Sequence, residues 1–323
     1  MTWLSRILAT SLASTMFASG ALFAQVYPAK PIRVIVPFAP GSATDQTGRA
    51  FGQKMAEFLG QPLVLDNRPG ANGMIGADAV AKAPPDGYTI LFGTNSTNAA
   101  LKSLMKKLPY DQDTAFAPVG FMGSVPLIVA VNNDLPLKTL GDLIALAKAK
   151  PGHVTFATAS TSQRISSEML AGMAGIKLTH VPYKSSPNAI TDLIGGQVMM
   201  FTADFAVMLP QVQAGKLRAL AVTSSKRSAL LPNLPAVNEV AGLKDYELTA
   251  FFAAYAPAGT PREAIMKLNA AINFAARSKE IVERFTSIGT ELSPGTPEAL
   301  GQRTAAEAVK WAKAIKDAGI EPE

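Results

Sequence analysis

Short β-branched segments that alternate with helical patterns constrain this chain to an α/β fold. The first segment, residues 33–36 (RVIV), is followed by Pro40-Gly41 and by a helical pattern that continues to Leu59. Further strand patterns lie at 63–65 and 89–92, with a helical pattern at 76–83 between them. This strand–helix–strand order predicts a parallel sheet flanked by helices.

The alternation stops in a polar, proline-containing stretch at 108–118 and restarts after a long apolar strand at 125–131. A second long apolar strand at 248–256 precedes the last three helical patterns. Two long strands that bracket the second α/β unit predict two lobes joined by paired crossings, with a ligand cleft between them. We expect each lobe to be a mostly parallel sheet flanked by helices. The predicted bounds are 25–125 and 250–323 for lobe 1 and 126–249 for lobe 2.

The first 24 residues have the pattern of a secretory signal peptide. Arg6 precedes an apolar stretch that ends in small residues, with cleavage expected after Ala24. A membrane anchor is the alternative, but the stretch is short and rich in Ser and Thr. We therefore predict an exported, soluble mature protein. The chain contains no cysteine, which excludes thiol nucleophiles, Cys-ligated metals and disulfides.

The charge of the chain is modest and dispersed. The formal net charge is +6, and the basic clusters at 106–107, 148–150 and 226–227 are short. No basic stripe is interleaved with aromatic residues, so we interpret these clusters as solvated surface and expect no nucleic-acid partner.

No motif of a known catalytic class is present. The chain lacks a Gly-x-Ser-x-Gly elbow, a phosphate-binding loop that ends in Gly-Lys-Ser/Thr, and a Gly-x-Gly-x-x-Gly turn. His153 and His180 are the only histidines, and neither has a metal-ligand partner at suitable spacing. We therefore predict no catalytic residue, no metal and no cofactor. The alternative is an exported hydrolase or isomerase that uses Asp45 or Asp204 as a base.

Loops rich in Ser and Thr precede several of the predicted helices. They lie at 41–45, 94–98, 158–162 and 185–187. Each loop alone is accounted for by helix capping. In an α/β sheet, however, such loops gather at the carboxyl ends of the strands, where the helix N-termini favour an anion. Four of them on two lobes predict an anion-binding cleft.

Long segments of the chain resemble the Bug-type substrate-binding receptors of tripartite tricarboxylate transporters. The resemblance covers essentially the whole mature chain, and its motifs are YPAKPIRVIVPFAPGSATD, LGQPLVLDNRPGANGMIGADAVAKAPPDGYTILFG, LPYD, FAPVG, VPYKSSPNAITDLIGGQV, AGKLRALAVTSSKR and YAPAGTP. It implies a two-lobed periplasmic binding protein fold and a monomeric receptor that captures a small organic carboxylate. It also implies delivery of the ligand to a membrane permease, with signalling to a membrane sensor kinase as the alternative output.

The resemblance also implies which residues bind the ligand. In the family, the loop after the first strand holds a carboxylate through backbone N–H groups and water, and this loop corresponds to residues 38–45. Segments 158–162 and 183–187 would contribute from lobe 2, and Asp204 lies where the family often has an acidic residue near the ligand. The predicted ligand-binding residues are Phe38, Gly41, Ser42, Ala43, Thr44, Asp45, Ser96, Asn98, Thr158, Ser160, Thr161, Ser162, Arg164, Tyr183, Ser186 and Asp204.

The chain departs from the family pattern in its loops. It has Ala-Pro-Gly-Ser at 39–42 where Pro-Pro-Gly-Gly is common, and Arg164 lies near a position that is usually His. A guanidinium there could pair with a second carboxylate, although a surface Arg on the first helical turns is the alternative. We therefore predict a dicarboxylate ligand, which is aromatic and terephthalate-like if Phe38 flanks a ring.

Overall fold

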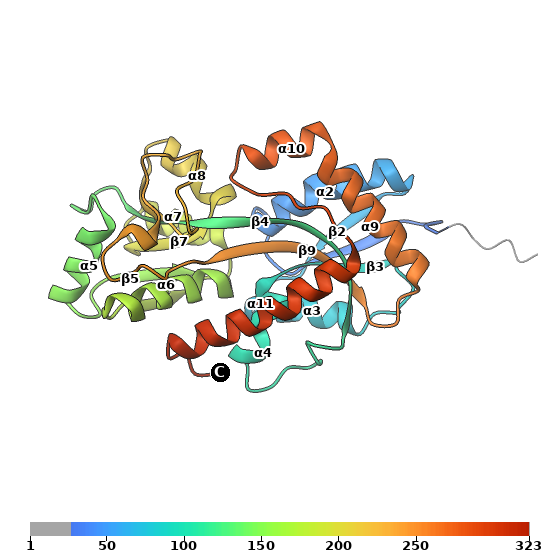
Figure 1. The fold of residues 1–323 in the computed structure, drawn as a ribbon, viewed down its shortest axis with the longest axis horizontal. Helices are drawn as coiled ribbons and strands as arrows, with labels where there is room; N and C mark the ends of the chain where they lie inside the picture. Colours follow the sequence, from blue (N-terminus) through green and yellow to red (C-terminus); the bar gives the residue numbers. More distant parts are fainter. Residues whose placement is uncertain (1–26, 323) are drawn as a thin grey trace, which may run out of the picture.

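The computed structural model of the chain describes residues 27–322 (Figure 1). The predicted signal peptide at 1–24 and the first residues of predicted lobe 1 lie outside the described residues. Within residues 27–322, no helix is both long enough and apolar enough to span a bilayer.

Within the described residues, nine strands form a sheet that extends through both lobes (Figure 1). Their order is β2-β1-β3-β9-β4-β7-β5-β6, and β8 pairs with β4 outside this path. The bounds are β1 (Ile32–Val36), β2 (Leu63–Asn67), β3 (Thr89–Thr94), β4 (Phe116–Asn132), β5 (Thr155–Thr158), β6 (Thr179–Pro182), β7 (Met200–Asp204), β8 (Leu217–Val222) and β9 (Thr249–Pro257).

Each lobe contains a parallel unit, which confirms the predicted α/β class. In lobe 1, β1 pairs in parallel with β2 and β3, and in lobe 2, β5 pairs in parallel with β6 and β7. The long strands β4 and β9 are antiparallel to their neighbours and connect the two units.

Strand β4 belongs to both lobes. From Phe116 to Pro126 it pairs with β9, and from Leu127 onward it pairs with β7 and β8. The local apolar pattern predicts this strand only from Val125, and the polar stretch at 108–118 predicts a loop. The N-terminal half was missed because Pro118, Gly120 and Gly123 interrupt its local pattern, whereas pairing with β9 keeps it extended.

Helices cover the sheet in both lobes (Figure 1). Local side-chain caps begin two of them: Ser42 caps the first long helix, and Thr139 with Asp142 forms a capping box. The helices are α2 (Ala43–Leu59), α3 (Met74–Ala81), α4 (Leu101–Leu104), α5 (Leu140–Ala149), α6 (Thr161–Ala174), α7 (Ser186–Ile194), α8 (Phe205–Gln213), α9 (Arg262–Arg277), α10 (Lys279–Thr286) and α11 (Pro297–Asp317), with short turns η1 (Ala71–Gly73), η2 (Ser96–Ala100) and η3 (Val237–Glu239).

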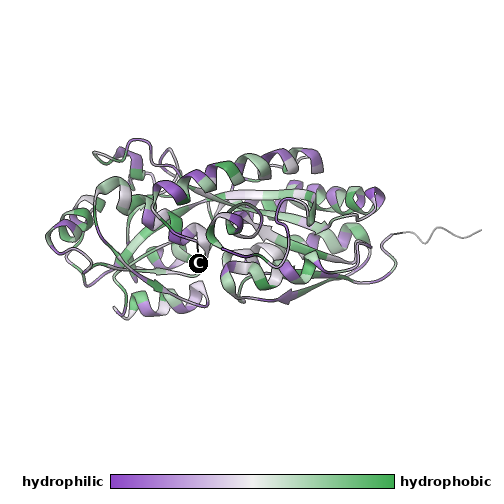
Figure 2. Ribbon diagram, turned by 90° about the horizontal axis from the view of Figure 1, so that it is seen from below, coloured by the Kyte–Doolittle hydropathy of each residue, from purple (hydrophilic) through white to green (hydrophobic). Residues whose placement is uncertain are grey.

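The apolar core follows the sheet through both lobes. The strands are largely hydrophobic, whereas the helices mix hydrophobic residues with hydrophilic ones (Figure 2). Helix α11 leaves lobe 1 and reaches α6 of lobe 2, where a Cβ at Gly172 would lie 4.0 Å from the carbonyl of Asp317. Helices α9 and α11 therefore pack on β4 and on elements of the first parallel unit, and α11 also contacts α6.

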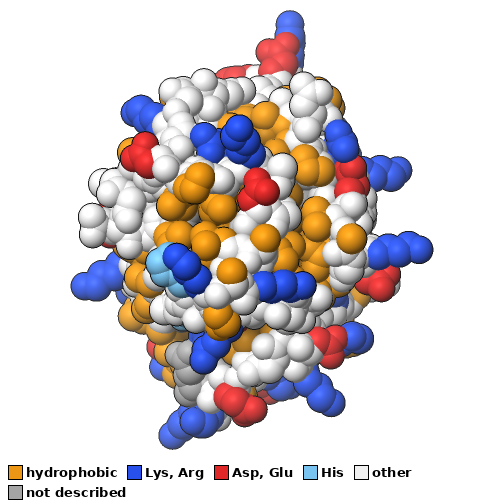
Figure 3. All heavy atoms as spheres, turned by 90° about the vertical axis from the view of Figure 1, so that its left-hand side faces the viewer, with side chains coloured by type: hydrophobic (Ala, Val, Ile, Leu, Met, Phe, Trp, Pro, Cys, Tyr) orange, Lys and Arg blue, Asp and Glu red, His pale blue; other side chains and the backbone are white. Residues whose placement is uncertain are grey.

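Charged side chains are dispersed over the outer end of lobe 2. On this face, hydrophobic side chains cover much of the middle, and Lys and Arg lie around and among them together with fewer Asp and Glu (Figure 3). The face therefore carries no continuous stripe of one charge.

Candidate functional site

A narrow cavity of about 30 Å³ lies between the two lobes. Lobe 1 contributes the loops after β1 and β3, and lobe 2 contributes the starts of α6 and α7 and the end of β7. Two residues of the connecting strand β9 complete the wall. The lining residues are Phe38, Ala39, Ser42, Ala43, Thr44, Thr94, Asn95, Ser96, Ala159, Ser160, Ser162, Gln163, Lys184, Ser185, Ser186, Asp204, Ala250 and Phe252.

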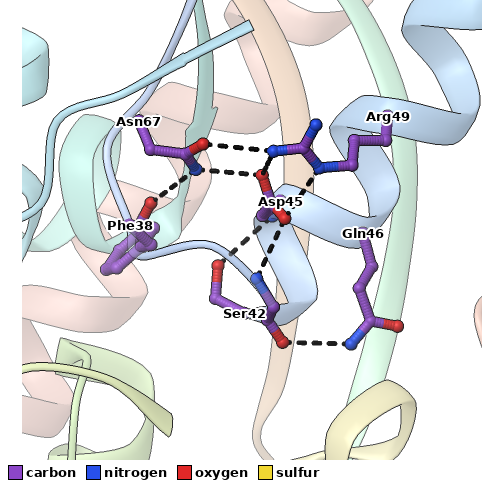
Figure 4. Close-up of polar contacts among 7 residues, drawn as sticks. Phe38, Ser42, Asp45, Gln46, Arg49 and Asn67 are labelled. Atoms are coloured by element: carbon purple, nitrogen blue, oxygen red, sulfur yellow. Dashed lines mark hydrogen bonds and ion pairs between the residues drawn. The ribbon is translucent and has the colours of Figure 1, made fainter. Parts of the chain in front are cut away.

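The first loop of the cavity is held by Asp45 (Figure 4). The Gly41 N–H donates to its Oδ2 at 2.9 Å, and the Asn67 side chain donates to its Oδ1 at 2.9 Å. Arg49 forms an ion pair with the same carboxylate. Burial acts to raise the pKa of Asp45, but hydrogen bonds from Arg49, Gly41 and Asn67 outweigh it and hold the pKa below its usual value. This carboxylate is therefore a charged structural anchor.

The start of α2 presents backbone donors to the cavity. Ser42 Oγ accepts from the Asp45 N–H at 3.2 Å, and the Ser42 carbonyl accepts from the Gln46 N–H. Within residues 27–322, the N–H groups of Ala43 and Thr44 have no acceptor. Both residues line the cavity, so the first turn of the helix offers two amide donors at its positive end.

The turn after β3 adds two more polar groups to the same wall. Asn95 Oδ1 accepts from the Phe251 N–H of β9 at 3.2 Å, which fixes the side chain. Among the described residues, Asn95 Nδ2 and Ser96 Oγ have no hydrogen-bond partner, although both side chains are only 1% exposed. Buried polar atoms of this kind are costly unless something binds them, so they indicate a ligand or ordered water.

Lobe 2 closes the opposite wall with a hydrogen-bonded hydroxyl cluster. Gln163 Oε1 accepts from the Ala159 N–H at 2.7 Å, and Gln163 Nε2 donates to Ser186 Oγ at 3.0 Å. Ser160 Oγ and Ser162 Oγ lie 3.1 Å apart. Gln163 therefore connects the starts of α6 and α7. The Ser-Pro pair at 186–187 alone predicts a cap at Ser186. Helix α7 is instead capped by Ser185, because Ser185 Oγ accepts from the Asn188 N–H.

Asp204, at the end of β7, is the one carboxylate among the lining residues. Asp204 is nearly buried, with 7% of its surface exposed. Burial raises the pKa of Asp204 to about 6, although hydrogen bonds from its own backbone N–H and from Gln163 act in the opposite direction.

The structure brings part of the predicted site together. The predicted residues that line the cavity are Phe38, Ser42, Ala43, Thr44, Ser96, Ser160, Ser162, Ser186 and Asp204. The predicted residues that do not line it are Gly41, Asp45, Asn98, Thr158, Thr161, Arg164 and Tyr183.

The residues outside the cavity wall have other contacts. Asn98 lines a separate groove beside α11 and accepts from Thr97. Thr158 Oγ1 lies 2.7 Å from His180 Nε2, and Tyr183 donates to Asp192 at 2.8 Å. Arg164 lies one helical turn before Glu168, whose pKa is raised by burial and partly lowered by the Arg164 charge. Its contact with a second ligand carboxylate stays a prediction.

The sequence singled out half of the lining residues individually, and most of the others lie within the segments that it indicated. The lining residues that it did not select are Ala39, Thr94, Asn95, Ala159, Gln163, Lys184, Ser185, Ala250 and Phe252. Asn95 and Ser185 lie in hydroxyl-rich loops that were singled out, so the signal was available for them. Ala250 and Phe252 look like ordinary strand residues, and only the pairing of β9 with β3 and β4 brings them to the cavity.

A two-lobed α/β chain with a polar cavity between its lobes is, by class, a solute-binding protein. The chain belongs to the tripartite tricarboxylate transporter receptor family, because the family model "Tripartite tricarboxylate transporter family receptor" matches residues 48–320. It is 38% identical to Protein BugT of Bordetella pertussis over 299 residues, 92% of this chain and 91% of that protein.

Solved structures show the same relationship. Rpa4515 of R. palustris, solved with adipate, is 34% identical with a TM-score of 0.89 over 92% of this chain and 100% of that one. The periplasmic binding protein BugD is 32% identical with a TM-score of 0.88 at the same coverage. MatC from Rhodopseudomonas palustris, solved with bound malate, is 30% identical with a TM-score of 0.85 over 90% of this chain and 100% of that one.

Proposed function

We propose that this protein is a periplasmic receptor that binds a small organic carboxylate and delivers it to a membrane transporter. The observation that carries the proposal is the wall of unsatisfied groups in lobe 1. The N–H groups of Ala43 and Thr44, together with Asn95 Nδ2 and Ser96 Oγ, line one cavity without a partner in the described residues. Such donors at a helix start suit a carboxylate. The adipate and malate of two structural relatives belong to the same chemical class.

In this proposal, lobe 1 (25–125 and 250–323) binds a carboxylate and lobe 2 (126–249) closes over the rest of the ligand. Residues of both lobes line the cavity, so the ligand enters when the lobes separate. A dicarboxylate suits the polar groups on both walls. We expect the mature receptor to act as an exported monomer.

We also propose that the protein carries out no chemistry on its ligand. The alternative enzyme would use Asp45 or Asp204 as a base. The carboxylate of Asp45 is already bound by Gly41, Asn67 and Arg49, and neither histidine lines the cavity. Mass spectrometry after incubation should recover a bound acid unchanged, and the appearance of a product would contradict this part of the proposal.

Thermal unfolding with a panel of small acids tests the proposed ligand class. We expect mono- or dicarboxylates to raise the unfolding temperature in a concentration-dependent way, because a ligand that binds only the native state stabilises it. The matched controls are the corresponding primary amides, which have similar shape and no charge. Stabilisation by the amides without stabilisation by the acids would overturn the proposal, and stabilisation by monocarboxylates alone would overturn the dicarboxylate part of it.

A further inference from the structure

We propose that Asp204 makes this receptor selective for carboxylates that also carry a hydrogen-bond donor, a hydroxyl or an ammonium group. The proposal rests on the proposed function, because it concerns the part of the same ligand that faces lobe 2. It is carried by the position of a buried carboxylate in the cavity wall without a cationic partner.

The fold holds Asp204 firmly at the cavity. Its backbone pairs with Leu127 of β4, and it is also the N-cap residue of α8. The next residue, Phe205, is buried, and its ring packs against Gly289. A Cβ added at Gly289 would lie 2.9 Å from this ring. This contact comes from the segment between α10 and α11. The backbone at Asp204 is therefore held by β4, by α8 and, through Phe205, by a segment that returns from lobe 1.

The charged groups around Asp204 leave its carboxylate without a counter-ion. Within residues 27–322, no ion pair involves Asp204, and the side-chain donor to it is the neutral amide of Gln163. Lys184 is the only cation among the lining residues, and it is exposed and forms no ion pair in the described structure. The Asp45 carboxylate of α2 does not line the cavity and is already paired with Arg49.

A buried carboxylate without a counter-ion favours a ligand that donates to it. A hydroxyl would supply a charge-assisted hydrogen bond, and an ammonium would also neutralise the charge. A second ligand carboxylate at this point would place two negative charges together in a poorly solvated space. On the opposite wall, the N–H donors at the start of α2 remain available to bind the ligand carboxylate. The two walls are therefore suited to bind different groups of one small molecule.

Calorimetric titration of matched acids at pH 7.5 tests this selectivity. The probes are three series that differ in one substituent: succinate, malate and aspartate; glutarate, 2-hydroxyglutarate and glutamate; propionate, lactate and alanine. In the series that fits the cavity, we expect the hydroxyl- or ammonium-bearing acid to bind at least about tenfold more tightly than its parent, the effect of one hydrogen bond to a charged group. In the Asp204→Asn variant, the same ratio should fall below about threefold.

Asp192→Asn is the matched control, because Asp192 is a lobe 2 aspartate that pairs with Tyr183 outside the cavity wall. It should keep the full preference. If the wild-type protein binds the parent acids as tightly as the substituted ones, the inference is wrong while the proposed function stands. A preference that persists in Asp204→Asn also overturns it. If none of these acids binds while another carboxylate raises the unfolding temperature, the inference is wrong and the proposed function stands. If no carboxylate binds at all, both are overturned.

Discussion

Two aspartates near the cavity are in opposite electrostatic situations. Asp45 and Asp204 are both nearly buried, at 3% and 7% exposure. Asp45 is surrounded by three donors, one of them cationic, and its pKa is lowered despite burial. Asp204 has only weak compensation, and burial raises its pKa to about 6. One carboxylate thus stabilises the empty protein, whereas the other reduces its stability.

Asp204→Asn should therefore stabilise the protein without ligand. Because the pKa of Asp204 is higher in the folded state than the ordinary value near 4, the folded state binds a proton more tightly, and stability falls as the pH rises from about 4 to about 6. Asparagine does not ionise, so the variant does not lose this stability as the pH rises. We expect the variant to gain on the order of 1–3 kcal/mol in unfolding free energy at pH 7.5 and nothing below about pH 4. Urea unfolding at several pH values measures this, and a variant less stable than wild type at pH 7.5 would contradict it.

Asp45→Asn should have the opposite effect. The lowered pKa of Asp45 means that its charge stabilises the folded state above the ordinary value near 4, and that this contribution is lost as the pH falls through the folded pKa. Replacement leaves the Arg49 and Gly41 donors with weaker acceptors. We expect a loss on the order of 1–3 kcal/mol at neutral pH that shrinks toward pH 3. Equal stability of the two proteins at neutral pH would show that Asp45 is not the anchor of this loop.

Among the structural elements, the start of α2 allows a test of the backbone donors. Ala43 is the first helical residue, where proline is well tolerated because no intrahelical acceptor is lost. The preceding Ser42 has φ −66° and ψ 161°, which also suits a following proline. Ala43→Pro should keep the unfolding free energy within about 0.5 kcal/mol and weaken carboxylate binding by about tenfold.

Ala43→Gly is the control for that variant, because it retains the N–H and removes only the methyl group. Calorimetry with a carboxylate found in the acid panel should show near wild-type affinity for the glycine variant. Unchanged affinity in Ala43→Pro would mean that this amide does not contact the ligand.

The elements also show which parts of the fold the sequence determines locally. Ser42 and Thr139 begin helices and Gly60 ends one through contacts within a few residues, so these boundaries are encoded locally. Strand β4 was predicted too short because its first half is held by β9, more than a hundred residues away. The cavity divides in the same way: the serine-rich helix starts were recognised, whereas Phe252 reaches the wall only through sheet pairing.

For the whole molecule, the connections between the lobes limit how they can move. Strands β4 and β9 pass between them side by side. Helix α11 also reaches α6 of lobe 2 (Figure 1). Near the cavity, a Cβ at Gly41 would lie 3.4 Å from the Pro187 ring, so the lobes approach closely there. These connections favour a hinge rotation that opens the cavity over free movement of the lobes.

Spin labels on the two lobes can measure this rotation, because the chain has no native cysteine. Met266 of α9 and Asn188 of α7 are exposed positions on different lobes, suitable for Met266→Cys and Asn188→Cys. The distance distribution between the labels should become shorter and narrower when a binding carboxylate is added, since ligand contacts with both walls favour the closed state. A pair within lobe 1, Met266→Cys with Val64→Cys, should not change. An unchanged distance between the lobes at saturating ligand would show that binding occurs without hinge closure.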